Sequence, residues 1–539
     1  MLNRISKSEL AAIADRVGWF RLTEAELDQY ALLSNSVLAV LDGVDASGLD
    51  QAWALDGAVS EGAAQAPTVR VPGRRPLQGE DPFNAVVRWC RVKQDGNDGP
   101  LAGLRLAVKD SVAIAGVPMT AGSTVLRGFT PSIDSVVVER LLRDGAEIVA
   151  VTNMDDFAFS GGGDTSSYGE IANPFALGRS AGGSSGGSAA ALYYGDVVDG
   201  AIGCDQGGSI RVPAAWCGVL GLKPTHSLVP YTGIAGIDAT FDHVGPMARS
   251  AGTLGRLLAS MAGPHPSDPR QAGVVWDGDA LQRALASEET GFDGLRVGLL
   301  VEGFSEDDDL RKANSAVVRD CAAKLAAAGA VVEEVSVPAH LTGGGIAFAG
   351  FIEGMAALLQ GGGNGYHAGG RYSPELALAL NQGLRTRGQE LPPQIKLVTL
   401  LGEHLRQNYS GAVYAAAQNQ RPWLRAAYDA ALAQYDVLLL PTTPYPAFRH
   451  EPGLGLAEKA LRGWEPLGNC AAFDMTGHPA ITLPVGTVDG LPVGAMLVGR
   501  RFDDARLVDL AGRYERRFGW DASISARQAE HTGPAVPAV

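Results

Sequence analysis

Short apolar runs alternate with amphipathic segments along most of the chain, a pattern typical of strands separated by helices. Residues 104–108 and 146–151 have the composition of buried strands, and 133–144 has helical spacing between them. The same order returns over 295–300, 309–328 and 331–337, and further short apolar runs lie at 437–440, 481–485 and 493–497. Strands that alternate with helices in this way predict an α/β fold.

The two ends of the chain have a different pattern. Two helices are predicted over residues 7–42, with apolar residues at helical spacing. Residues 43–85 are rich in Gly, Ala and Pro and read as a linker, while 525–539 is expected to be frayed. Residues 406–434 read as one helix, broken or kinked near Pro422. We therefore expect an N-terminal helical extension and linker over 1–80, a main domain over 81–525 and a C-terminal tail over 526–539.

Composition excludes several classes of protein. The chain has 539 residues and a net charge of −15, which argues against a nucleic-acid surface. Its five cysteines are odd in number and scattered without a CxxC pair, so we expect neither a disulfide framework nor a zinc site. No apolar run approaches the roughly 18 residues that span a membrane, and residues 1–20 lack the pattern of a signal peptide. A cytoplasmic protein without a membrane or nucleic-acid partner is the expectation.

Two glycine-rich serine clusters carry the candidate chemistry, at residues 182–188 and 205–211. Glycines let backbone N–H groups approach a ligand closely, and successive N–H groups form an anion site. A flexible linker would not alternate with apolar segments such as 189–192 and 212–222. Neither cluster is followed by the lysine of a phosphate-binding loop, and Ser209 does not lie in a Gly-x-Ser-x-Gly turn. The clusters favour acyl transfer by a serine hydroxyl.

A serine nucleophile needs a base, because a free hydroxyl is weakly nucleophilic near neutral pH. Nine histidines are scattered along the chain, and none lies in either serine cluster. Partners in a Ser-His-Asp arrangement can be distant in sequence, so the residues alone leave a histidine base open.

The two clusters, together with Gly221-Leu222-Lys223-Pro224-Thr225, resemble the signature of the amidase signature family of serine hydrolases. That resemblance covers roughly residues 80–520. It implies a triad of Lys109, Ser184 and Ser209, in which Ser184 follows a cis peptide bond and bridges base and nucleophile. Lys109 ends an apolar run 75 residues before Ser184, and Ser209 follows 25 residues after it, one more than the family's usual spacing. The resemblance further implies an oxyanion hole of N–H groups from Gln206, Gly207 and Gly208.

The same resemblance implies a large twisted mixed sheet flanked by helices, preceded by a helical extension, and a homodimer that needs no cofactor. It is strongest to bacterial amidases of nitrile metabolism, which implies hydrolysis of a small-molecule carboxamide to acid and ammonia. Phe157, Phe159 and Phe241 lie in segments expected to border the pocket, which would favour an apolar or aromatic acyl group. The alternatives are the amidase subunit of a tRNA-dependent amidotransferase, a hydrolase of carbamates, anilides or hydrazides, and a catalytically silent scaffold.

Overall fold

The computed structural model describes residues 4–17, 22–41, 68–274, 276–363, 365–366 and 369–530. Contacts divide the chain into two units, Met1–Ala64 and Gln65–Val539. The first unit contains the two predicted helices, α1 (Lys7–Val17) and α2 (Glu24–Leu41). Lys7 joins them through ion pairs of 2.8 Å to Glu24 and 2.7 Å to Asp28.

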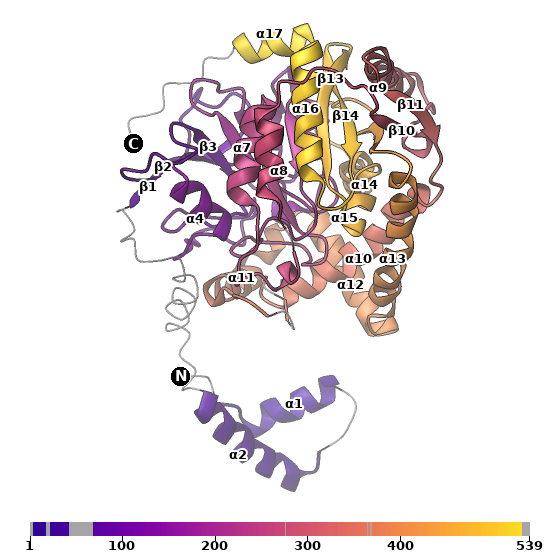
Figure 1. Ribbon diagram of the computed structural model, residues 1–539. Helices are drawn as coiled ribbons and strands as arrows, with labels where there is room; N and C mark the ends of the chain where they lie inside the picture. Colours follow the sequence, from indigo (N-terminus) through magenta and orange to yellow (C-terminus); the bar gives the residue numbers. More distant parts are fainter. Residues whose placement is uncertain are drawn as a thin grey trace. The chain divides into compact units, whose positions relative to one another are not determined.

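The second unit is built on a twelve-stranded mixed sheet, which confirms the large mixed sheet that the family resemblance implies (Figure 1). In spatial order its strands are β1 (Thr68–Arg74), β2 (Val86–Gln94), β4 (Glu147–Thr152), β3 (Arg105–Lys109), β7 (Gly200–Asp205), β9 (His243–Ala248), β8 (Leu220–Lys223), β13 (Ala480–Val488), β14 (Leu491–Val498), β12 (Val437–Pro441), β10 (Arg296–Leu300) and β11 (Val331–Val335). Strand β3 is parallel to both neighbours, and β10 is parallel to β11 and β12. A separate hairpin pairs β5 (Ala172–Asn173) with β6 (Ala176–Ser180).

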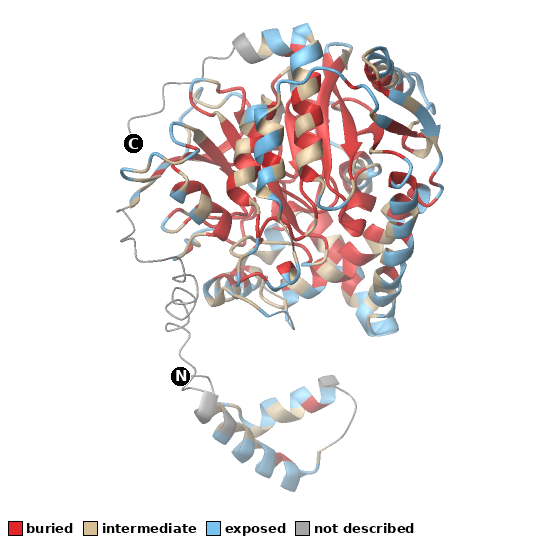
Figure 2. Cartoon of the chain, viewed as in Figure 1, coloured by how far each residue is buried: buried red, intermediate tan, exposed pale blue. Residues whose placement is uncertain are grey.

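Helices cover both faces of this sheet, whose inner strands are buried while the edge strands β1 and β11 are partly exposed (Figure 2). One apolar cluster packs the first face under α4 (Val136–Arg143), α7 (Ala251–Met261), α8 (Gly278–Ala286), α9 (Asp309–Ala327) and α16 (Asp504–Phe518). Two clusters fill the other side with α5 (Gly186–Ala191), α6 (Arg211–Cys217), α10 (His340–Gln360), α11 (Pro374–Arg387), α12 (Pro393–Tyr409), α13 (Ala412–Leu432) and α15 (Ala471–Thr476). Helix α14 (Leu456–Trp464) lies before α15, and α17 (Ala522–Glu530) follows α16. Short 3₁₀ turns are η1 (Asp156–Ala158), η2 (Pro269–Gln271), η3 (Val301–Gly303), η4 (Gly388–Glu390) and η5 (Glu465–Leu467).

The alternation of side chains along β3 determines where its last residue points. Leu106 and Val108 belong to the cluster under α4 and α7, whereas Ala107 packs with α5 and α6 on the opposite face. Because side chains two apart in a strand share a face, Lys109 lies on the same side as Ala107. The sheet therefore directs this lysine toward the two serine clusters.

Three boundaries differ from the sequence-based expectation. The second unit begins at Gln65 rather than residue 81, because residues 68–74 form β1 and pair with β2. The helix predicted over 406–434 is instead two helices, divided at Ser410 and Gly411, which have φ angles of 51° and 81°; Pro422 lies inside α13. The expected tail begins within α17, which continues to Glu530; residues 531–539 and the linker residues 43–67 lie outside the described part.

Helix α10 is, by length and composition alone, apolar enough to cross a membrane. Half of that segment is buried inside the protein, against α12, α13 and α15. Its apolar composition is accounted for by this packing, as in the core helices of soluble proteins.

Candidate active site

Lys109 meets the first serine cluster in the interior of the molecule. Its Nζ donates to Ser184 Oγ at 2.7 Å and to Ser185 Oγ at 2.8 Å, and it lies 3.4 Å from the Cys204 carbonyl oxygen. The lysine is completely buried, and burial lowers its pKa from 10.5 to about 8. The Gly183–Ser184 peptide bond is cis, as the resemblance implies.

The two neighbouring serines differ in what their hydroxyls already do. Ser185 Oγ donates to the Cys204 carbonyl at 3.0 Å, so toward Lys109 it can only accept. Within the described part of the chain, Ser184 Oγ has no partner other than Lys109. The Ser185 N–H donates to the Ser209 carbonyl at 3.1 Å, which brings the two serine clusters into contact. Ser184 is therefore the serine whose proton is free to move.

The second cluster is held in shape by Asp205, at the end of β7. Its carboxylate accepts from the N–H groups of Gly208 at 2.6 Å and Ile210 at 3.0 Å. Gly208 has a φ of 138°, and a Cβ there would lie 2.8 Å from Cys470 Cβ, so the turn requires glycine. Within the described residues, the N–H groups of Gln206 and Gly207 have no hydrogen-bond partner. Of the three N–H groups predicted to form an anion site, these two are free and that of Gly208 is engaged.

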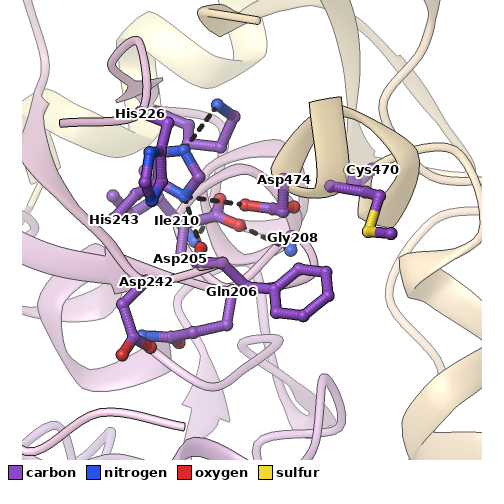
Figure 3. A network of polar contacts seen from close by, with 12 residues as sticks. Asp205, Gln206, Gly208, Ile210, His226, Asp242, His243, Cys470 and Asp474 are labelled. Carbon is purple, nitrogen blue, oxygen red and sulfur yellow. Dashed lines mark hydrogen bonds and ion pairs between the residues drawn. The ribbon is translucent and has the colours of Figure 1, made fainter. Parts of the chain in front are cut away.

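Behind this loop lies a buried ionic network (Figure 3). Arg211 donates to Asp205 at 2.9 Å and to Asp474 of α15 at 2.5 Å, and all three side chains are fully buried. Burial opposes ionisation of Asp205, but Arg211 outweighs it and holds the pKa of this carboxyl below its ordinary value. Lys223 donates to the His478 carbonyl at 2.6 Å and lies 3.3 Å from His243 Nε2. The network anchors the nucleophile loop to two distant parts of the chain.

Ser209 opens onto a cavity of about 860 Å³. Much of its wall is apolar or aromatic, formed by Phe159, Ile237, Leu341, Phe348, Phe351, Leu461, Trp464 and Leu467. Its polar lining residues are Ser160, Gln206, Ser209, His340, Glu458, Arg462 and Glu465. A Cβ on Gly207 would lie 3.2 Å from the Phe351 ring, so an apolar wall adjoins the loop directly. The cavity is suited to a ligand with an apolar body.

The three predicted pocket aromatics take different places. Phe159 lines the cavity and makes an edge contact with Trp464, with ring centroids 6.2 Å apart. Phe241 is fully buried behind the wall, where its ring packs against Phe351 at 4.6 Å. Phe157 is buried in η1 and is not among the residues that line the cavity.

One histidine, His340, is among the residues that line this cavity. Asn469 donates through Nδ2 to the carbonyls of Gly303 and Pro441, so its Oδ1 is an acceptor. His340 Nε2, 3.3 Å from that oxygen, must therefore carry the hydrogen, and Nδ1 accepts from the Tyr428 hydroxyl at 2.7 Å. With both ring nitrogens engaged, His340 has no lone pair left to take a proton from Ser209.

The structure adds a residue that sequence reasoning missed. Asp155, just after β4, accepts from the N–H groups of Gly163, Asp164 and Thr165, each at 2.9 Å. Its own N–H donates to the Ser184 carbonyl at 3.3 Å. Burial raises the pKa of Asp155 to about 6. Its place at the carboxyl end of a strand beside β3 is a signal that could have marked it.

Comparisons with known proteins agree with this geometry. A family model described as Amidase matches residues 90–508. An enantioselective amidase of Rhodococcus rhodochrous is 39% identical over 82% of this chain and 85% of its own length. One subunit of the glutamyl-tRNA(Gln) amidotransferase of Methanosarcina mazei is 34% identical over 80% of this chain and 88% of its own. The X-ray structure of native peptide amidase from Stenotrophomonas maltophilia superposes with a TM-score of 0.65 at 28% identity, covering 83% of this chain and 92% of that one. The similarity spans Lys109 and both serine clusters.

Proposed function

Because this chain belongs to the amidase family, whose enzymes hydrolyse amide C–N bonds, we propose that it converts carboxamides to acids and ammonia through an acyl-enzyme on Ser209. The observation that carries the proposal is the buried contact of Lys109 with Ser184, next to a nucleophile loop that opens onto an apolar cavity. A lysine serves as a base only when neutral, and burial favours the neutral form.

Hydrogen counting supports the direction of proton transfer. A neutral Lys109 has two hydrogens, which Ser185 Oγ and the Cys204 carbonyl can accept, and one lone pair left for Ser184. In the proposed step Ser209 Oγ attacks the amide carbonyl and gives its proton to Ser184, which passes its own to Lys109. The same path returns the proton to the departing ammonia. Water then attacks the acyl ester by the reverse relay and releases the acid.

The developing oxyanion would be stabilised by the free N–H groups of Gln206 and Gly207. Gly208, whose N–H donates to Asp205, would instead fix the loop that presents the other two. Losing one such donor typically costs about 2.7–4 kcal/mol of transition-state stabilisation. In this arrangement Asp205 and Arg211 are positioning residues, because they hold the loop and do not reach the cavity.

An apolar, aromatic-sized acyl group fits the wall beside the nucleophile. Phe351 and Leu467 adjoin Gly207 and Gly208, and Phe159 with Trp464 completes an aromatic corner. Apolar surface of this kind stabilises a bound ring by excluding water from both partners. We propose benzamide-type and arylacetamide substrates on this basis.

The test follows ammonia and acid release from benzamide and from short aliphatic amides, with the native protein and the variants Ser209→Ala and Lys109→Ala. We expect aromatic amides to be hydrolysed and both variants to lose nearly all activity. Loss with Ser209→Ala but not with Lys109→Ala would refute lysine as the base. Anilides, carbamates and hydrazides in the same assay define how far the reaction extends.

The similarity to an amidotransferase component supports a second candidate, an amidase that uses glutamine as its ammonia donor with partner subunits. Glutamine carries an ammonium and a carboxylate, which need charged partners close to the scissile amide. Phe351 and Leu467, which adjoin Gly207 and Gly208, offer none, but the charged residues Glu458, Arg462 and Glu465 line the same cavity and could meet these groups. A glutaminase assay separates the two candidates. The homodimer and the cytoplasmic location stay predictions, and sedimentation of the purified protein tests the first.

A further inference from the structure

One part of the Ser209 cavity is polar and has no role in the proposed reaction. It is formed by Ser160, in the loop after η1, and by Arg462 of α14, both of which line the cavity. Ser160 is 2% exposed, and the Arg462 side chain is 17% exposed. Polar side chains this deep in a protein are normally hydrogen-bonded, so unused donors here call for an explanation.

The two residues belong to one contiguous group. Ser160 Oγ and Asp164 Oδ1 lie close to each other beside Gly162. A Cβ placed on that glycine would lie 2.8 Å from Asp164 Oδ1 and 3.2 Å from Ser160 Oγ. Asp164 Oδ2 in turn lies 4.0 Å from Arg462 Nη2. On the other side, a Cβ on Gly463, the neighbour of Arg462, would lie 2.5 Å from Ser160 Oγ.

Each residue has donor capacity that its neighbours do not use. Arg462 Nη1 lies 3.4 Å from Glu451, Nη2 lies 4.0 Å from Asp164, and the guanidinium stacks 4.3 Å above the Phe448 ring. Its Nε is buried and has no partner within the described residues, so the Nη groups of this partly exposed side chain are the donors that a ligand in the cavity can reach. Ser160 Oγ accepts from the Gly162 N–H at 3.0 Å, and its hydroxyl hydrogen has no acceptor within the described part of the chain. Burial raises the pKa of Asp164, while the charges of Lys459 and Arg462 lower it.

Other hydrogen-bond donors among the polar side chains of the wall are already engaged. Gln206 Nε2 donates to the Tyr231 hydroxyl, although its buried Oε1 has no partner within the described residues, and both nitrogens of His340 are taken. Glu465 accepts from the Tyr445 hydroxyl and pairs with Arg311. Two donors, one of them positively charged, therefore remain together at one place in an otherwise largely apolar wall.

We propose that Ser160 and Arg462 form a polar subsite that binds an oxygen acceptor, a carboxylate or a carbonyl, carried on the acyl part of the amide substrate. This inference rests on the proposed amide hydrolysis and specifies its substrate class. The subsite lies one side chain away from the nucleophile loop, because Leu467 Cδ2 would lie 2.8 Å from a Cβ on Gly161 and 3.2 Å from one on Gly208. A benzamide ring could therefore bridge the two, with its amide at Ser209 and its acceptor at Arg462.

The experiment compares ammonia release from 3- and 4-carbamoylbenzoate, their methyl esters and the matched methylbenzamides. We expect at least one acceptor-bearing substrate to exceed its methyl analogue in kcat/KM by about tenfold or more, the usual effect of a hydrogen bond to a charged group. Arg462→Met should bring that ratio toward one, and Ser160→Ala should reduce it. Arg91→Met removes a positive charge from an exposed pair with Glu147 and does not touch the cavity lining, so it should keep the ratio. The esters distinguish a neutral carbonyl from a carboxylate as the preferred acceptor.

The subsite would be overturned if the wild-type protein hydrolysed every acceptor-bearing substrate and its methyl analogue with the same kcat/KM. It would also be overturned if Arg462→Met lowered kcat/KM equally for both substrates of a pair. If no amide is hydrolysed, the proposed function fails, and calorimetric titration with the carbamoylbenzoates then tests the subsite by itself. Binding that is weakened about tenfold by Arg462→Met but not by Arg91→Met supports it. Binding that is the same in all three proteins refutes it.

Discussion

The pH dependence of hydrolysis tests the lysine base most directly. Burial lowers the pKa of Lys109 to about 8, so the neutral base makes up about a tenth of the protein at pH 7. An ordinary lysine would supply only about one part in three thousand at that pH. We therefore expect kcat/KM to rise about tenfold per pH unit below 8 and to level off above it, since deprotonation creates the active form.

A charge substitution near the base sharpens this test. Burial lowers the pKa of Lys109, and the nearby carboxylates of Asp155 and Asp205 act in the opposite direction and raise it. Replacing Asp155 by Asn removes one of these negative charges and so lowers the pKa of Lys109. The rising part, or limb, of the pH–rate profile should therefore move to lower pH. Asp95→Asn, at an exposed position on the surface, should leave the limb in place.

Initial rates of ammonia release from pH 5.5 to 10 at constant ionic strength measure both effects. A limb centred near 6.5 would indicate a histidine base instead. A rate that is constant from pH 6 to 9 would refute any base that titrates in this range. A limb that moves upward in Asp155→Asn would contradict the electrostatic argument, because the loss of a negative charge cannot raise a lysine pKa.

Two further predictions concern the serines and the buried network. Ser184→Ala should lower kcat by about 10²–10⁴-fold, the usual contribution of acid–base catalysis, whereas Ser185→Ala should lower it less than about tenfold. Steady-state kinetics of the two variants measures the difference. Equal losses would contradict the assignment of Ser184 as the serine that gives its proton to Lys109. Arg211→Met removes the guanidinium that pairs with both Asp205 and Asp474, leaves only Lys223 to offset them, and should destabilise the protein by about 3–5 kcal/mol in urea unfolding. Arg91→Met breaks only an exposed pair with Glu147 and should cost at most about 1 kcal/mol, so similar costs would refute the argument.

Several strands could be predicted because their signals are local, although β1 lies in residues that were assigned to the linker. Apolar runs such as 146–151 and 437–440 are flanked by turn signals, and each forms a strand within one or two residues of the prediction. The boundary between α12 and α13 could not be predicted in the same way. Ser410 and Gly411 take positive φ angles there, while Pro422 is accommodated inside a helix, so the obvious helix breaker was the wrong signal.

The candidate site likewise has one part that could be predicted from the sequence and one part that could not. Its serine clusters are continuous stretches of glycine and serine, which motif reasoning can find. The cavity wall is assembled from Phe159, Phe348 and Trp464, which come from three distant segments with ordinary composition. A sequence shows that such aromatics exist but not which of them meet, and so Phe241 was expected at the wall that Phe351 forms.

The buried charges show why the distant segments matter to the chemistry. Asp205, Arg211 and Lys223 all lie near the nucleophile in sequence, yet their acidic partner Asp474 comes from α15. With Asp474 ionised, the two carboxylates balance the two cations, whereas without it Arg211 and Lys223 would leave an uncompensated charge beside the nucleophile loop. Ala471, on the same short helix, lines the substrate cavity. Movement of α15 would therefore alter the cavity wall and the charge balance behind Ser209 together, which couples the shape of the cavity to the position of Ser209.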